Sequence, residues 1–107
     1  MQLTPYDIEC INNAKNLIDA DMSRHHTINE IAAQAGTSST KLKKGFKEIN
    51  GLGLYHYLHE QRMQKGIYLL ENTHKTLKQI SHILGYRYPC NFITAFKKRF
   101  GRTPRRW

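Results

Sequence analysis

Two short segments of the chain carry polar and basic side chains at helical spacing. In the first segment these side chains are Ser39, Thr40, Lys41, Lys43, Lys44 and Lys47. A lysine ammonium group can donate to guanine N7 and O6 or to a phosphate, and a threonine can reach a base edge or a thymine methyl group. We expect phosphate contacts from Lys41 and Lys47, and groove or base contacts from the other four residues.

The second segment has a corresponding set with different side chains. These are Arg87, Tyr88, Cys90, Asn91, Thr94, Lys97 and Lys98. The Asn91 amide matches the N6 and N7 atoms of adenine, and Thr94 can donate, accept or pack on a methyl group. We expect phosphate contacts from the arginine and the two lysines, and groove contacts from the rest. Cys90 has a second interpretation, as a small buried residue, and Ile93 lies either at the edge of the core or against a thymine.

The two segments belong to a repeat within the chain. Residues 27–51 and 76–101 share a threonine, an isoleucine, a glycine, a phenylalanine, a lysine and a final glycine in the same order. Each copy is typical of a helix-turn-helix unit. Thr27 and Thr76 begin the copies in capping boxes with Glu30 and Gln79. Because free N–H groups at a helix start favour phosphate, both threonines are also candidate phosphate contacts, with capping alone as the alternative.

The periodicity of apolar residues predicts the elements that position these side chains. Helices are expected over residues 5–20, 27–35, 39–49, 54–70, 76–85 and 89–100, with room for a short last helix after Pro104. No segment alternates with period two, so the expected fold is all-α. Its two helix-turn-helix subdomains, residues 1–52 and 72–107, are joined by a linking helix within residues 53–71. That helix would be about 25 Å long, which suits two reading helices about 34 Å apart along B-DNA.

Apolar residues that recur on one helix face are expected to form the core. They are Ile8, Ile11, Ala14, Leu17, Ile18, Leu42, Phe46, Ile49, Phe92, Phe96 and Phe100. Two glycines lie inside expected helices, where glycine costs about 1 kcal/mol relative to alanine. Gly66 indicates a close contact between helices. Gly45 allows the approach of a duplex or of another helix, or simply weakens its own helix.

The charge balance points to a polyanionic partner. The 107 residues carry 17 Lys and Arg against 8 Asp and Glu, a net charge of +9, and no acidic residue follows Glu71. This favours nucleic acid or an acidic membrane as the partner, contacted mainly by the later part of the chain. There is no membrane-spanning run and no signal-peptide pattern. Cys10 and Cys90 have no metal-ligand spacing, so we expect a cytoplasmic protein with two reduced thiols.

Other classes of function fit the residues less well. No nucleophile lies beside a placed base and no glycine loop cradles phosphate, so we expect neither an enzyme nor a cofactor. His56 and His59 could share a helix face, but two ligands without a third predict no metal site. A membrane-surface role needs a broad exposed apolar stripe, and the phenylalanines are required for the core. The alternative that stays open is a non-specific basic module that binds nucleic acid or an anionic surface.

The two copies and their linker resemble the DNA-binding domain of AraC/XylS-type transcriptional regulators, from about Ile8 to the C-terminus. The most specific part is IxxxLGY at Ile80–Tyr86, followed by NFITAFKKRFGRTP at Asn91–Pro104. IAAQAGTSSTKLKKGFK at Ile31–Lys47 and YHYLHEQRMQKGIYLL at Tyr55–Leu70 are also similar to the family patterns.

The resemblance implies seven helices, with the helices 39–49 and 89–100 in successive major grooves of double-stranded DNA. It also implies regulation of transcription, contacts to RNA polymerase, and an effector or dimerisation domain for which this chain has no room. The chain is then either a stand-alone activator or a fragment of a longer regulator. Pro89 and Cys90 occupy positions where the family usually has polar residues. The second unit is therefore expected to bind DNA more through phosphate contacts than through base contacts. Arg62 matches a family arginine and is expected to be structural, pairing with a carboxylate or a carbonyl.

Overall fold

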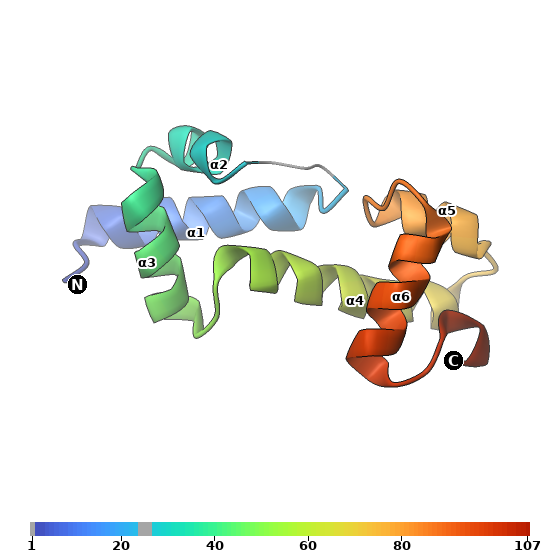
Figure 1. Ribbon diagram of the computed structural model, residues 1–107. Coiled ribbons are helices and arrows are strands. Elements are labelled where there is room, and N and C mark those ends of the chain that lie inside the picture. The colour runs from blue at the N-terminus through green and yellow to red at the C-terminus, as the bar shows by residue number, and fades with distance from the viewer. Residues whose placement is uncertain (1, 24–26) are drawn as a thin grey trace. The chain divides into compact units, whose positions relative to one another are not determined.

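The computed structural model describes residues 2–23 and 27–107. These residues form six α-helices and one 3-10 turn, and they contain no strand (Figure 1). The elements are α1 (Pro5–Ala20), α2 (Ile28–Ala35), α3 (Ser39–Asn50), α4 (Leu54–Asn72), α5 (Leu77–Ile83), α6 (Pro89–Phe100) and η1 (Pro104–Arg106). The all-α prediction is confirmed, and each expected helix is present with its ends displaced by no more than about two residues.

The chain divides into two compact units. Among the residues described, unit 1 holds 2–21 and 27–59, and unit 2 holds 22–23 and 60–107. Unit 1 therefore consists of α1, α2, α3 and the beginning of α4, and unit 2 of the rest of α4 with α5, α6 and η1. The linking helix contributes to both units.

Side-chain caps determine where the helices of unit 1 begin. The Thr4 hydroxyl accepts a hydrogen bond from the Asp7 amide at 3.1 Å, and the Asp7 carboxylate accepts one from the Thr4 amide at 2.9 Å. Thr27 and Ser38 each accept from the amide three residues further on and so begin α2 and α3. Gly36 ends α2 with φ of 86°, a left-handed conformation that is cheap for glycine. The first helix-turn-helix is thus set by local hydrogen bonding.

The core of unit 1 collects one face from each of its helices. Its buried members are Ile11, Ala14, Ile18, Ile31, Ala32, Ala35, Leu42, Phe46 and Leu54. Gly45 of α3 lies against α1, where an added Cβ would stand 2.5 Å from Cδ1 of Ile11. Of the three interpretations of this glycine, the structure therefore supports the close approach of another helix.

Unit 2 has its own core around the second half of α4. Its buried members are Met63, Leu69, Ile80, Leu84, Phe92 and Phe96. A Cβ at Gly66 would lie 3.2 Å from Phe92 Cε1 and 3.3 Å from Leu84 Cδ1, which confirms the predicted close contact at this glycine. Gly85 follows α5 with φ of 91°, and a Cβ there would meet the Ser23 carbonyl oxygen at 2.7 Å. Glycine is therefore required at this turn for both backbone conformation and space.

Four residues expected in the core are less buried than predicted. Ile8 and Ile49 are 41% and 40% exposed, and Leu17 and Phe100 are only partly buried. The inward face of α1 is centred nearer to Asp7, which is 3% exposed, and Ile8 lies about 100° further around the helix. Ile49 lies in the last turn of α3, which projects past α1 (Figure 1). Periodicity predicts a direction but not whether a neighbouring element covers it.

Candidate nucleic-acid interface

The outward face of α3 carries side chains that can contact a polyanion. They are Thr40, Lys43, Lys44 and Lys47, and all four are exposed. The burial of Leu42 and Phe46 on the opposite side of α3 turns this face to solvent. Among the residues described, the side chains of Thr40, Lys43 and Lys44 have no hydrogen-bond or ion-pair partner. Their donors are therefore available to a ligand without any internal bond being broken.

Two other residues of the α3 set are engaged within unit 1. The Ser39 hydroxyl donates to the side-chain oxygen of Asn29 in α2. The Lys41 ammonium nitrogen lies 3.1 Å from Oδ1 of Asp7. The hydrogen bond from the Thr4 amide, and then Lys41, hold the pKa of Asp7 below its ordinary value. Lys41 would have to exchange this carboxylate for a phosphate in order to contact DNA.

The outward face of α6 carries the second set. Cys90, Asn91, Thr94, Lys97 and Lys98 are all exposed. Cys90 is therefore not the small buried residue of the alternative interpretation, and its thiol is free and lies 3.9 Å from Oδ1 of Asn91. Compared with α3, this face offers fewer positive charges in its first two turns.

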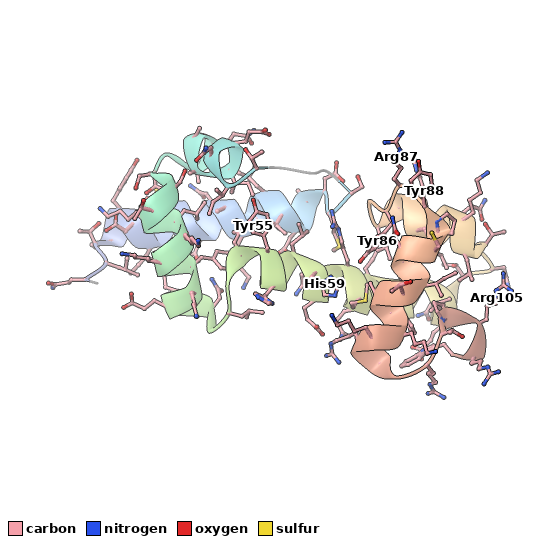
Figure 2. All side chains as sticks on the ribbon, in the orientation of Figure 1. Tyr55, His59, Tyr86, Arg87, Tyr88 and Arg105 are labelled. Carbon is pink, nitrogen blue, oxygen red and sulfur yellow. The ribbon has the colours of Figure 1, made fainter. Side chains whose placement is uncertain are left out.

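Arg87 and Tyr88 precede α6 and point away from the body of unit 2 (Figure 2). Tyr88 is 53% exposed, and the Arg87 guanidinium lies 5.5 Å from the centre of its ring. Tyr88 provides no side-chain cap for α6, and Pro89 occupies the first turn. Both side chains are thus available beside the amino end of α6.

Thr76 and Gln79 form the predicted capping box, whereas at Thr27 the described residues show only one of the two bonds of the predicted box. Thr27 accepts from the Glu30 amide at 3.2 Å, and Thr76 accepts from the Gln79 amide at 3.1 Å while the Gln79 side chain accepts from the Thr76 amide at 2.9 Å. Both threonines are exposed. A hydroxyl that accepts from an amide keeps its own hydrogen, so each cap can still donate to a phosphate.

Arg62 is part of the scaffold of unit 2 and not of the exposed faces. Its Nε donates to the Met22 carbonyl at 2.9 Å, which confirms the predicted pairing with a carbonyl. Its guanidinium also lies 5.7 Å from the centre of the Tyr86 ring. Burial lowers the pKa of Arg62 and raises the pKa of Tyr86.

Three arginines that sequence reasoning did not assign to the site lie together beside the end of α6. Arg102, Arg105 and Arg106 line a hollow of about 420 Å³ with Lys97. The basic run at the end of the chain is visible in the sequence. Which of its members face a common space depends on the turn of the chain after Gly101, and no spacing rule supplies that information.

Neither a membrane span nor a metal cluster is found in the described part of the chain. No helix there is long and apolar enough to cross a bilayer. No three His, Cys, Asp or Glu side chains of residues 2–23 and 27–107 gather as they would around a metal ion. His56 and His59 are exposed on α4.

Known proteins resemble this chain over most of its length. A family model described as a helix-turn-helix domain matches residues 31–107. The Msm operon regulatory protein of Streptococcus mutans is 31% identical over 94 residues, which are 88% of this chain and 34% of that protein. The DNA-binding dual transcriptional regulator Rns of Escherichia coli is 32% identical over 97 residues, 90% of this chain and 36% of that protein. The chain thus spans about a third of the length of these curated relatives.

Solved structures of similar proteins share the fold of this chain. The crystal structure of an AraC-type transcriptional regulator from Chromobacterium violaceum matches with a TM-score of 0.81 and 27% identity, covering 91% of this chain and 87% of that one. The family match includes all of α3, α4, α5 and α6, and therefore both exposed faces. This chain belongs to the AraC-type helix-turn-helix family of transcriptional regulators, as a DNA-binding domain with two helix-turn-helix units.

Proposed function

We propose that this chain binds double-stranded DNA sequence-specifically and thereby regulates transcription. In this function α3 and α6 enter successive major grooves, each with its outward face toward the base edges. The observation that carries the proposal is the exposed set on α3, in which Thr40, Lys43 and Lys44 have no partner among the described residues. Donors of this kind match guanine N7 and O6 and the thymine methyl group.

The charge of the chain supports the same partner. A net charge of +9 attracts a polyanion over a distance and releases counterions when lysines and arginines meet phosphates. Candidate phosphate contacts are Thr27, Lys41, Lys47, Thr76, Arg87, Lys97 and Lys98. These contacts would orient the chain on the duplex, whereas base contacts would select the sequence.

The two units would contribute unequally to sequence selection. In the repeat, Cys90 and Ile93 of α6 occupy the positions of Thr40 and Lys43 in α3. A thiol is a weak donor and an aliphatic side chain has none, so Asn91 and Thr94 are left as the base-reading candidates of α6. We therefore assign more of the recognition of DNA bases to α3 and more of the contacts to the DNA phosphates to unit 2.

Further partners belong to the same proposal. The chain spans about a third of the regulators it matches, and those proteins include one named as a transcriptional activator. Contact with RNA polymerase, and coupling to an effector-binding or dimerisation domain, would complete the regulatory function in the bacterial cytoplasm.

A selection of bound duplexes from a random pool tests the proposal directly. The selected site should be footprinted, and we expect two protected stretches whose centres lie about one helical turn, roughly 34 Å, apart. Lys44→Ala should weaken binding to that site by about 1–3 kcal/mol and relax the base preference in one half. Thr94→Ala should act on the other half.

Lys47→Ala is the matched control for Lys44→Ala, because it removes the same charge from the same helix face. As a phosphate contact it should weaken binding to all sequences about equally. Equal affinity of the wild-type chain for selected and scrambled duplexes would favour the non-specific alternative. Protection of a single groove would refute the insertion of both helices.

A further inference from the structure

The hollow beside the carboxyl end of α6 is lined almost entirely by basic residues. Its lining residues are Lys97, Gly101, Arg102, Thr103, Arg105 and Arg106. Four of these six residues are cationic, and none is acidic. The carboxyl end of α6 adds a partial negative charge of about half an elementary charge, which four cations outweigh. The hollow is therefore a site for an anion.

The hollow is built on an aromatic cluster in the core of unit 2. The Trp107 ring meets Phe96 edge-on at 5.3 Å between ring centres, and its Nε1 donates to Oε2 of Glu71 at 3.2 Å. The Arg102 guanidinium lies 4.7 Å from the centre of the Trp107 ring. The ring thus fixes the position of η1 and orients one arginine of the hollow.

Arg105 extends outward from η1 (Figure 2). Gly101, at the start of this turn, has φ of 83°, and apart from its chain neighbours no heavy atom of the described residues lies within 4 Å of where its Cβ would be. The Thr103 hydroxyl forms no capping bond to η1. The mouth of the hollow is therefore open, and it offers a neutral donor beside the cationic ones.

Unit 1 has no counterpart to this charge. With the offset of 50 residues that relates Phe46 to Phe96, the three arginines correspond to Leu52, Tyr55 and His56. The scaffold is nonetheless alike, because Tyr57 meets Phe46 at 5.5 Å between ring centres, as Trp107 meets Phe96. The turn that follows α3 in unit 1 thus lacks the three arginines that line the hollow in unit 2.

Lys97 connects the hollow to the outward face of α6. It follows Cys90 and Thr94 at helical spacing, and it also lines the hollow. An α-helix of 12 residues is about 18 Å long, whereas the major groove is about 12 Å wide. When α6 crosses the groove with its first turns at the base edges, its last turn therefore passes over the phosphates that border the groove.

We infer that the hollow lined by Lys97, Arg102, Arg105 and Arg106 clamps a backbone phosphate of the DNA strand that borders the groove entered by α6. This inference rests on the proposed function and assigns to unit 2 a phosphate contact made by Lys97 of α6 together with three arginines that follow its helix-turn-helix. Trp107 is the only tryptophan of the chain, so its emission reports on Arg102 directly.

The test uses the selected duplex and single-charge variants. Arg102→Gln and Arg105→Gln should each lower the slope of log affinity against log salt by about one, and together they should weaken binding roughly tenfold near 0.15 M salt. Arg105→Lys should keep the slope. Lys65→Gln, which removes one exposed cation from α4 in the same unit, is the matched control and should change affinity less than about twofold.

A second measurement identifies the phosphate itself. Neutral methylphosphonates are placed one at a time along the strand that borders the α6 groove. At one position the loss of affinity seen with the wild-type chain should disappear in the Arg102→Gln, Arg105→Gln double variant. Wild-type Trp107 emission should shift on binding the unmodified duplex and shift less on binding that substituted duplex. Circular dichroism and thermal melting confirm that each variant is folded.

The inference and the proposed function fail in different ways. Suppose that Arg105→Gln shows the same affinity, and the same slope of log affinity against log salt, as the control Lys65→Gln. If the footprint still covers both halves of the site, that result refutes the phosphate clamp and leaves the proposed DNA recognition intact. Tighter binding to anionic vesicles than to the duplex, lost in the double variant, would assign the hollow to a membrane instead. If the wild-type chain protects no second half-site, the proposed function itself fails before any variant is compared.

Discussion

Alanine at position 45 tests the packing of α3 on α1. Gly45 is buried, and the Cβ of an alanine there would stand 2.5 Å from Cδ1 of Ile11 and 3.3 Å from Cδ2 of Leu3. Ordinary contacts of this kind are 3.4–4 Å, so the Ile11 methyl group would have to retreat by about 1 Å in a close-packed core. Ile11→Val removes that methyl group and nothing else, which makes the two substitutions a matched pair.

The magnitudes follow from three terms. Alanine in place of glycine stabilises a helix by about 1 kcal/mol, whereas overpacking a core costs about 1–3 kcal/mol, so Gly45→Ala alone should lose about 1 kcal/mol. Ile11→Val alone should also lose about 1 kcal/mol. In the double variant the overlap is gone and the new methyl group fills part of the space. Its stability should therefore be close to that of the wild type, with a coupling of about 2 kcal/mol.

Urea denaturation of the four proteins measures this coupling. Affinity for the selected duplex is measured in parallel, and it should change little in all three variants. A loss of stability that is simply additive would refute the account of Gly45 as a contact with α1. Weakened DNA binding by Gly45→Ala with unchanged stability would instead mean that the glycine admits the duplex.

Three further predictions concern single side chains. The pKa of Asp7 is lowered in the folded chain, so its stabilising contribution is complete above the pKa of the unfolded carboxyl group. That contribution is lost as the pH falls through the pKa of the folded state. Asp7→Asn should therefore flatten the curve of melting temperature against pH in this range. A thiol reagent should label exposed Cys90 quickly and buried Cys10 only at the rate of unfolding, and equal rates would contradict the packing of α1. Arg62→Lys keeps the charge but loses the planar guanidinium group that donates to the Met22 carbonyl. It should lower the free energy of unfolding, measured with urea, by about 1–2 kcal/mol. Unchanged stability with weaker DNA binding would instead make Arg62 a DNA contact.

Much of the fold could be predicted because it depends on residues close to one another in the chain. The caps at Thr4, Ser38 and Thr76 and the left-handed turn at Gly36 are bonds or conformations within three or four residues. The residue type at each of these positions is almost sufficient to predict the local backbone geometry. The exposed set on α3 could be predicted for a similar reason, because the apolar residues Leu42 and Phe46 indicate which side of the helix faces the core.

Contacts between distant residues could not be predicted in the same way. The sequence contains Asp7 and Lys41, Gly45 and Ile11, but nothing local says that they meet. The exposure of Ile49 is a similar case, because a side chain in the right direction stays exposed where no neighbouring element covers it. Periodicity describes one helix at a time, whereas burial depends on two.

The basic end of the chain separates the two kinds of information most clearly. Its composition indicates a polyanionic partner, because a run without acidic residues keeps its positive charge in any fold. Only the packing of Trp107 on Phe96 brings Arg102 and Arg105 around one hollow with Lys97. Charge is a property of the residues themselves, but a site requires several of them at one place, and that place is decided by the core on which they rest.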